Sequence, residues 1–215
     1  MSRTADACWY SSNNFYEYVC YDGGMKNLLL LSAILWTLCT SLGAQETPPN
    51  ITVESVLTQF ALDGDFENVK KLVAAGVPVD SVNDDKTTPL MWSAFNGHQQ
   101  VVAFLLEQGA SIDMKDANGR TALLYASSGP FPDIVTLLLQ KNAAIDIQGT
   151  AEGFTALMMA AAEGQAEVVR VLLAHGASTA LTDKDGDTAE KFARDNGHTL
   201  VVKLLKSPET EDSQP

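Results

Sequence analysis

Cysteine, basic residues and long apolar runs are scarce in this sequence, and each scarcity excludes a class of protein. All three cysteines, Cys8, Cys20 and Cys39, precede residue 45, so neither a disulfide framework nor a thiol nucleophile can explain the rest of the chain. Lys and Arg number 14 against 27 Asp and Glu, which gives a net charge of -13. This charge repels nucleic-acid phosphates and anionic lipid headgroups, so we expect no nucleic-acid partner and favour a partner with a basic patch.

One apolar run, from Leu28 to about Leu42, stands out near the N-terminus. It follows Lys26 and precedes small residues, which is the pattern of a secretory signal peptide over residues 25–44. The run is shorter than the roughly 20 apolar residues that a transmembrane helix needs, so cleavage after Gly43 or Ala44 is favoured over a retained anchor. We therefore expect a periplasmic or secreted protein.

The segments around this run fit less simply. Residues 1–24 are polar and aromatic, unlike the start of a signal peptide, so Met25 could be the true start and the upstream stretch an extension from a misassigned gene start. If Met1 is the true start, the apolar run becomes an uncleaved signal anchor and the protein stays tethered to the membrane. Residues 45–53 contain a Pro pair and no apolar periodicity, which indicates a linker. The acidic, polar tail over residues 207–215 is expected to be disordered.

Self-similar segments recur through the rest of the chain. A weak copy, SVLTQFA, begins at Ser55, and a second apolar segment such as VVAFLL from Val101 follows each copy in the same phase. Four stronger copies are spaced 33, 34 and 33 residues apart: TPLMWSA, TALLYAS, TALMMAA and TAEKFAR, from Thr88, Thr121, Thr155 and Thr188. A fixed period of this size with two short helices in each period predicts an all-α solenoid.

Two further series of residues have the same period. Residues suited to a left-handed helix cap end the second helices, namely Gly76, Gly109, Asn142 and Gly176. Glycines suited to a tight turn precede three of the Thr residues, namely Gly119, Gly153 and Gly186. Each turn is expected to project a hairpin-like finger.

These submotifs together resemble the ankyrin repeat, whose pattern D-x-x-G-x-T-P-L-H-x-A-A, G-H, V-V-x-x-L-L and G-A is matched over residues 54–206. The resemblance implies about five helix-turn-helix repeats with β-turn fingers, over 54–82, 83–115, 116–149, 150–182 and 183–206. The family's His after T-P-L is replaced by Thr58, Met91, Leu124, Met158 and Lys191, so we expect packing to replace the hydrogen bond that it usually makes between repeats. Glu190 and Lys191 stand where apolar residues are usual, as a solvated C-terminal cap requires.

Residues that could support catalysis all have structural explanations. His98 and His198 occupy the G-H position, and His175 precedes a helix-ending Gly, where a His favours the helix dipole. Three separate histidines without cysteine do not form a zinc site. DKDGD at Asp183 begins like a calcium loop but lacks the distal Glu, so it is interpreted as a turn. We expect no enzyme activity, no metal and no cofactor.

The resemblance implies that a partner binds the concave surface made by the fingers and the exposed ends of the first helices. Phe95 and Phe154 stand out there because exposed aromatic residues and Arg dominate interface hot spots, although either ring could instead fold onto its own repeat stack. The predicted contact residues are Phe95, Arg120, Phe154, Asp84, Asp85, Asn96, Asn118, Glu152, Glu163, Lys184, Asp185 and Asp187.

The neighbouring apolar residues are less clear as contacts. Phe131, between two prolines in the one turn that lost its Gly, is a further candidate contact. Residues one helical step from the contact positions are expected to be partly buried: Trp92, Tyr125, Met159 and Phe192.

The sequence therefore predicts a protein–protein interaction module that acts outside the cytoplasm, as a monomer. Two alternatives remain open: an inhibitor or immunity protein that occludes a toxin or hydrolase, and an effector delivered into host cells. Membrane contact is expected only if the signal segment is not cleaved.

Overall fold

The computed structural model describes residues 53–206, which contain helices and no strand. The first helices of the repeats are α2 (Val53–Asp63), α4 (Pro89–Phe95), α6 (Ala122–Ser127), α8 (Ala156–Ala162) and α10 (Ala189–Asp195). The second helices are α3 (Phe66–Ala74), α5 (Gln99–Glu107), α7 (Pro132–Gln140), α9 (Ala166–Ala174) and α11 (Thr199–Lys206). Five helix pairs confirm the predicted all-α solenoid. The predictions for residues 1–24, for the signal peptide at 25–44, for most of the linker at 45–53 and for the tail at 207–215 lie outside the described residues.

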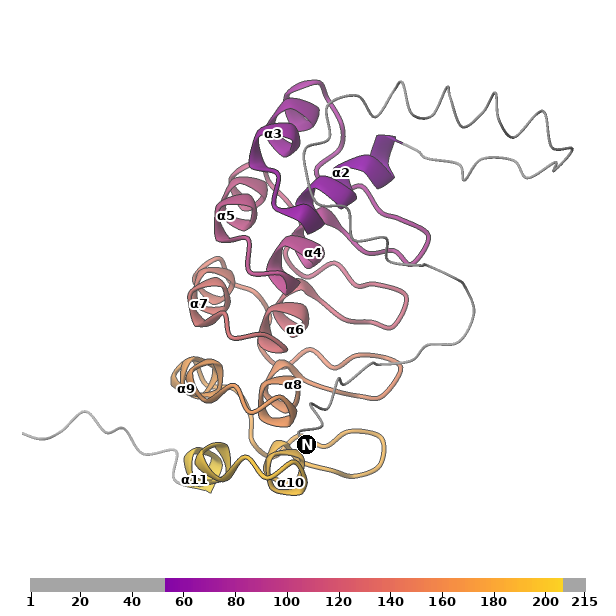
Figure 1. The fold of residues 1–215 in the computed structure, drawn as a ribbon. Helices are drawn as coiled ribbons and strands as arrows, with labels where there is room; N and C mark the ends of the chain where they lie inside the picture. The colour runs from indigo at the N-terminus through magenta and orange to yellow at the C-terminus, as the bar shows by residue number, and fades with distance from the viewer. Residues whose placement is uncertain (1–52, 207–215) are drawn as a thin grey trace, which may run out of the picture. The chain divides into compact units, whose positions relative to one another are not determined.

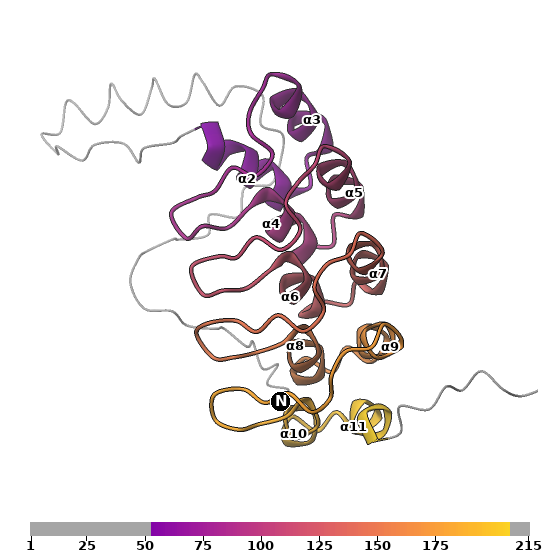
Figure 2. The same cartoon turned by 180° about the vertical axis from the view of Figure 1, so that it is seen from behind.

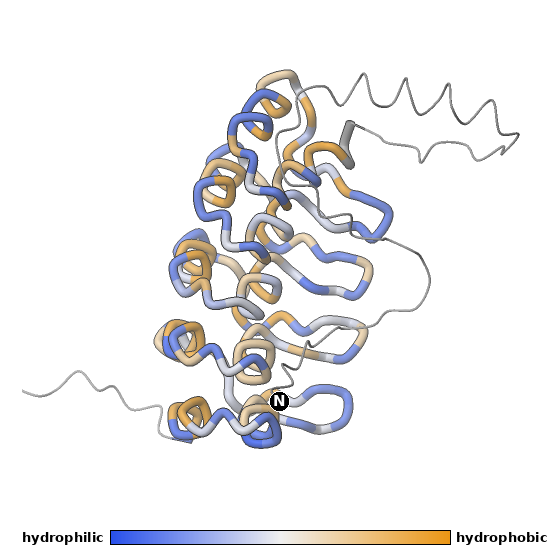
Figure 3. The backbone as a smooth tube through the Cα atoms, in the orientation of Figure 1, coloured by the Kyte–Doolittle hydropathy of each residue, from blue (hydrophilic) through white to orange (hydrophobic). Residues whose placement is uncertain are grey.

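The helices form two columns joined by projecting loops. Figures 1 and 2 show the first helices stacked in one column, the second helices stacked in another, and a loop projecting at each connection between repeats. We call these loops fingers 1 to 4, over residues 80–87, 113–120, 146–154 and 180–187. Figure 3 shows hydrophobic residues concentrated in the helices and hydrophilic residues at the finger tips.

Threonine side chains cap three of the first helices, α4, α8 and α10. The Thr88 and Thr155 hydroxyls accept hydrogen bonds of 3.2 Å from the amides of Met91 and Met158. The sulfurs of the same two methionines lie 3.4 and 3.5 Å from the Thr88 and Thr155 amides and complete capping boxes. Both methionines are also buried in the core, so packing is what they contribute between repeats, and the sulfur serves as a weak acceptor only within its own repeat.

The third repeat departs from this pattern. Leu124 stands in the place of the methionine and has no acceptor, and α6 has no side-chain cap. The Thr121 hydroxyl is buried and has no hydrogen-bond partner in the described part of the chain. Among the four first helices that follow a Thr, α6 therefore has the fewest hydrogen bonds at its start.

The predicted turn residues adopt the left-handed conformation. Gly76, Gly109 and Gly176 have φ between 86° and 91°, and Asn142 takes the same role with φ of 66°. Finger 1 has no Gly at the position that matches Gly119, and Lys86 takes the left-handed conformation there with φ of 59°. The helix ends and finger turns thus follow the glycine series that the sequence predicted.

The core lies between the two columns and runs the length of the stack. Leu123, Ala126, Leu157 and Ala160 are buried, as predicted, and the Val and Leu residues of the second helices pack against them. Each repeat thereby buries its apolar face against its neighbours, as solenoid stacking requires. None of the described helices is long and apolar enough to cross a membrane.

Paired polar side chains join the first repeat to the second and the fourth to the fifth. The Leu62 carbonyl oxygen lies 2.7 Å from Asn96 Nδ2 and 2.9 Å from His98 Nε2. The Ala162 carbonyl oxygen lies 2.9 Å from Asn196 Nδ2 and 3.0 Å from His198 Nε2. The structural interpretation of these two histidines is confirmed. His175 likewise bonds the Val171 carbonyl at the end of α9, at 2.8 Å.

The junction between the second and third repeats lacks this pair. Gly129 and Phe131 stand where Asn96 and His98 stand one repeat earlier, and neither side chain can donate a hydrogen bond. The Phe131 ring packs instead over Gly97, so closely that a Cβ added there would lie 2.3 Å from the ring. Phe131 thus has a packing role, and its predicted role as a partner contact stays a prediction.

Candidate functional site

Backbone hydrogen bonds tie the four fingers into one continuous edge. The Ala117 amide donates to the Asp85 carbonyl at 2.9 Å, and the Thr150 amide donates to the Asn118 carbonyl at 2.7 Å. The Lys184 amide continues the series to the Glu152 carbonyl at 2.9 Å. The spacing of the fingers is therefore fixed by backbone hydrogen bonds.

An acidic or amide side chain also holds each of three fingers from within. Asn83 Oδ1 in finger 1 and Asp116 Oδ1 in finger 2 each accept hydrogen bonds from two backbone amides. In finger 4 the Asp183 carboxylate accepts from the amides of Asp185 and Asp187, at 3.0 and 2.8 Å. The DKDGD segment is thus a turn built on Asp183, as interpreted. Among residues 53–206, no group of three His, Cys, Asp or Glu side chains is arranged to hold a metal ion.

Three rings from α4 and α6 form an aromatic cluster beside fingers 1 and 2. The cluster consists of Trp92, Phe95 and Tyr125, whose ring centroids lie 5.8 to 6.0 Å apart. Phe95 meets both neighbours edge to face, a favourable arrangement for aromatic pairs. Tyr125 is only 7% exposed and Trp92 is half-buried, as predicted, whereas Phe95 is 41% exposed. The cluster therefore presents one ring to solvent and holds it with two others.

The two inner rings are fixed by hydrogen bonds to the fingers. Trp92 Nε1 donates to Thr87 Oγ1 at 2.8 Å, and the Tyr125 hydroxyl donates to Asp116 Oδ2 at 2.8 Å. These bonds lock the aromatic cluster to the bases of fingers 1 and 2. Neither ring can rotate away without leaving a polar group unsatisfied.

Asp116 organises the centre of the surface and was not among the predicted contact residues. Its carboxylate is 1% exposed and accepts the Arg120 Nε at 2.8 Å in addition to the Tyr125 hydroxyl. The Arg120 guanidinium lies 4.8 Å from the centroid of the Tyr125 ring, a cation–π contact. The D-x-x-G-x-T pattern predicts an Asp at position 116, but only the structure shows that its carboxylate binds both Arg120 and Tyr125.

Tyr125 is held in its neutral, donating form. Burial raises the pKa of Tyr125 well above its usual range, and the hydrogen bond to Asp116 adds to this effect. The negative charge of Asp85 raises the same pKa further, although by less. The phenol proton is consequently retained wherever the protein is folded at ordinary pH.

Most of the predicted contact residues are exposed, and a few are engaged in other contacts. The exposed ones are Asp84, Asp85, Phe95, Asn96, Asn118, Glu152, Glu163, Lys184 and Asp185. Asp187 is partly buried and bonds Lys191 Nζ at 2.6 Å. Arg120 is partly exposed and paired with Asp116. Their roles as contacts remain predictions.

Phe154 is less exposed than predicted. Its ring is partly buried against the core and meets the Phe192 ring edge to face, with centroids 5.0 Å apart. The alternative that one of the two rings folds onto the repeat stack thus holds for Phe154. Met159 and Phe192 are also partly buried, as predicted.

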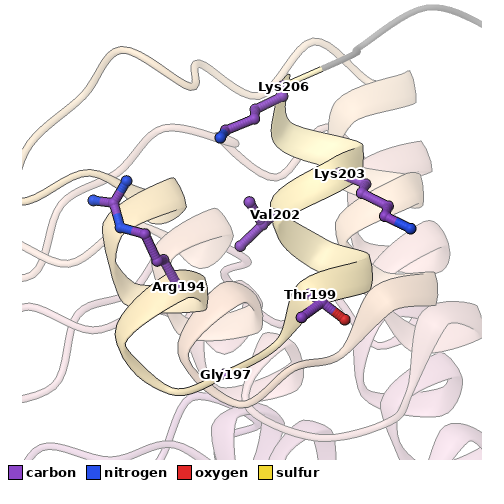
Figure 4. Close-up of a pocket in the computed structure, with 6 residues that line it drawn as sticks. All are labelled: Arg194, Gly197, Thr199, Val202, Lys203 and Lys206. Carbon is purple, nitrogen blue, oxygen red and sulfur yellow. The ribbon is translucent and has the colours of Figure 1, made fainter.

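Two shallow hollows in the described part of the chain lie away from the aromatic cluster. One of about 330 Å³ lies between α10 and α11, and Figure 4 shows the side chains that surround it: Arg194, Thr199, Val202, Lys203 and Lys206, with Gly197 at its edge. Two of its cations, Arg194 and Lys206, pair with Glu190 at 3.3 and 3.5 Å. The other, of about 370 Å³, lies between fingers 3 and 4. Both are open surface features, so a broad surface is the better candidate site.

A stack of two-helix repeats joined by tied fingers is the architecture of a known repeat family. A family model described as three copies of the ankyrin repeat matches residues 57–150 and matches again over residues 131–213. The chain belongs to the ankyrin-repeat family. Ankyrin repeats form a protein–protein interaction module, and the family is typically a non-enzymatic binding scaffold.

Proposed function

We propose that this ankyrin-repeat protein binds its partner through the concave surface around α4, α6 and fingers 1 and 2. The exposure of Phe95 carries this proposal. Among the described residues, the exposed large hydrophobic side chains are Val82, Phe95 and Leu200, and Phe95 is the aromatic one. A large aromatic ring with this much exposed surface is the type of residue that dominates interface energies.

The surroundings of Phe95 support the same surface. Trp92 and Tyr125 hold the ring in place, so little side-chain entropy is lost when a partner covers it. Asn96, Arg120 and Asn118 offer polar groups around it, which matches an apolar centre with a polar rim.

We further propose that binding takes place outside the cytoplasm. This part rests on the signal-peptide pattern of residues 25–44. Cell fractionation with N-terminal sequencing would test it: recovery of the repeats on the cytoplasmic side would contradict it, whereas a mature chain that retains residues 1–24 would indicate the membrane-tethered form.

The binding surface is tested by Phe95→Ala. A partner would first be captured from a periplasmic or secreted fraction and identified by mass spectrometry, and affinities would be measured by calorimetry. We expect Phe95→Ala to weaken binding by about 2 kcal/mol or more while helicity is unchanged. Leu200→Ala is the control, because Leu200 is a similarly exposed apolar residue on the second-helix column.

Phe154→Ala tests the outer part of the surface. We expect a smaller loss of affinity than for Phe95→Ala, because the Phe154 ring is partly buried against Phe192. Since Phe154 packs on Phe192, binding of this variant must be compared well below its melting temperature. Wild-type affinity in both variants would show that the partner binds elsewhere.

A further inference from the structure

Unpaired negative charge lies next to the aromatic cluster. Asp84 and Asp85 at the tip of finger 1 are exposed, and within the described part of the chain neither forms an ion pair with a basic side chain. Asp85 lies in finger 1 two residues before Thr87, whose hydroxyl binds Trp92 of the cluster, and the Asp85 carbonyl accepts from the Ala117 amide of finger 2. The exposed Phe95 ring and a free carboxylate therefore belong to the same part of the surface.

The nearest fixed cation does not reverse this charge. Arg120 Nε is bound at 2.8 Å by the Asp116 carboxylate, which is 1% exposed and has no access to a partner. Because the two charges of this pair offset each other, the field in front of the cluster is set by Asp84 and Asp85, with Lys86 as the opposing charge of finger 1.

We propose that the aromatic cluster and Asp85 receive a Lys or Arg side chain of the partner that lies next to an apolar residue. This proposal rests on the proposed function and names the chemistry of its partner. The cationic head pairs with the Asp85 carboxylate, and the aliphatic stem lies along the exposed Phe95 ring, as such side chains commonly do. The neighbouring apolar residue covers the rest of the ring.

Other occupants fit the surface less well. An acidic partner would be repelled by Asp84 and Asp85 at contact distance. A purely apolar segment that covered Phe95 would remove water from Asp85 without replacing its hydrogen bonds, which is unfavourable for a carboxylate. A cation beside an apolar residue satisfies both the ring and the charge.

A random-peptide display library, selected against the full-length protein, tests this preference. We expect selected peptides to be enriched in Lys or Arg next to an aliphatic or aromatic residue. Synthetic copies should bind Asp85→Asn and Phe95→Ala variants at least about tenfold more weakly than the wild type. Asp133→Asn on α7 is the matched control, because it removes one exposed carboxylate from the second-helix column and should leave affinity unchanged.

Salt gives an independent measurement on the same peptides. Raising NaCl from about 50 to about 300 mM should weaken wild-type binding severalfold, and the dependence should be smaller in Asp85→Asn.

The outcomes separate the two proposals. If the selected peptides are acidic or uncharged, or if Asp85→Asn keeps wild-type affinity, the cation preference is wrong. If the same peptides still lose affinity with Phe95→Ala, the proposed binding surface stands. Peptides that bind all variants equally, or no selected peptide at all, would contradict both proposals.

Discussion

Lys86 adopts a left-handed backbone conformation, whereas glycine occupies the matching position in the other fingers. Its φ is 59°, whereas Gly119 and Gly186 have φ of 76° and 84°. For a residue with a Cβ, the left-handed region costs about 1–2 kcal/mol. Finger 1 tolerates this strain because the Asn83 side chain and the Ala117 amide hold the loop on both sides.

Lys86→Gly should therefore stabilise the protein. The strain disappears, and part of the gain is lost to the greater freedom of Gly in the unfolded chain, so we expect a net increase of about 1 kcal/mol in the free energy of unfolding. Urea unfolding followed by circular dichroism measures it. Lys115→Gly in finger 2 is the control: it removes the same charge where φ is not left-handed, and it should not stabilise. Equal effects of the two changes would show that Lys86 is not strained.

Tyr125 predicts a specific loss of stability at alkaline pH. The pKa of its phenol is raised in the folded protein, so the unfolded chain releases this proton first. The contribution of Tyr125 to the free energy of unfolding is fully present below about pH 10, near the pKa of a tyrosine in the unfolded chain. Above that pH it falls by up to about 1.4 kcal/mol per pH unit.

A comparison with Tyr125→Phe isolates this contribution. The variant lacks the hydroxyl that donates to Asp116 and should be less stable than the wild type near neutral pH. Because the variant has no phenol to titrate at this position, the stability difference should narrow as pH rises above about 10. Urea titrations at several pH values measure the difference, and a constant gap would contradict the assignment.

At the scale of the elements, the junction between the second and third repeats depends on Phe131. Gly97 has φ of 78°, and an added Cβ would meet the Phe131 ring at 2.3 Å, whereas at Gly76, with φ of 91°, an added Cβ would meet nothing within 4 Å. Ala at either position incurs the strain of the left-handed conformation, but only Gly97→Ala also displaces a ring.

Gly97→Ala should consequently be the more destabilising of the two changes. We expect an additional loss of about 1–3 kcal/mol relative to Gly76→Ala, measured by urea unfolding. The double variant Gly97→Ala with Phe131→Ala should lose less free energy of unfolding than the sum of the two single variants, because the added Cβ no longer meets a ring. Equal losses at Gly97 and Gly76 would show that the ring moves aside freely.

The helices were predictable from sequence because their signals repeat. The Thr starts, the Gly and Asn ends and the apolar phase each indicate the same period, so an error in one is corrected by the others. Side-chain partners do not repeat in this way. Packing across repeats directed the Phe154 ring onto Phe192, and two methionine sulfurs accept from the Thr amides at the helix starts, and neither result follows from spacing.

The candidate site was predictable in part for the same reason. Phe95 stood out because its position in the repeat is an exposed one, and the structure places it at 41% exposure. The aromatic cluster was not predicted, because Trp92 and Tyr125 belong to different repeats and meet only when the first helices stack. Asp116 was missed because its role depends on burial, which a turn pattern does not reveal.

At the scale of the whole described stack, polar and apolar groups are distributed unevenly along its length. Asn96 with His98, and Asn196 with His198, bond across the first and the last junctions. The junction bridged by Phe95 and Tyr125 relies on packing and on the tied fingers. In a solenoid, stability is a sum of repeats and nearest-neighbour interfaces, so differences between junctions matter locally.

These junction differences have a mechanical consequence. A solenoid bends most easily at the junctions between repeats where the fewest hydrogen bonds must break. The Asn and His pair is absent from both middle junctions, where Gly129 and Phe131 or Glu163 and Gln165 stand in its place, so bending is expected to concentrate in the middle of the stack. A partner bound to Phe95 spans one of these two middle junctions, so its binding would reduce bending on that side of the stack.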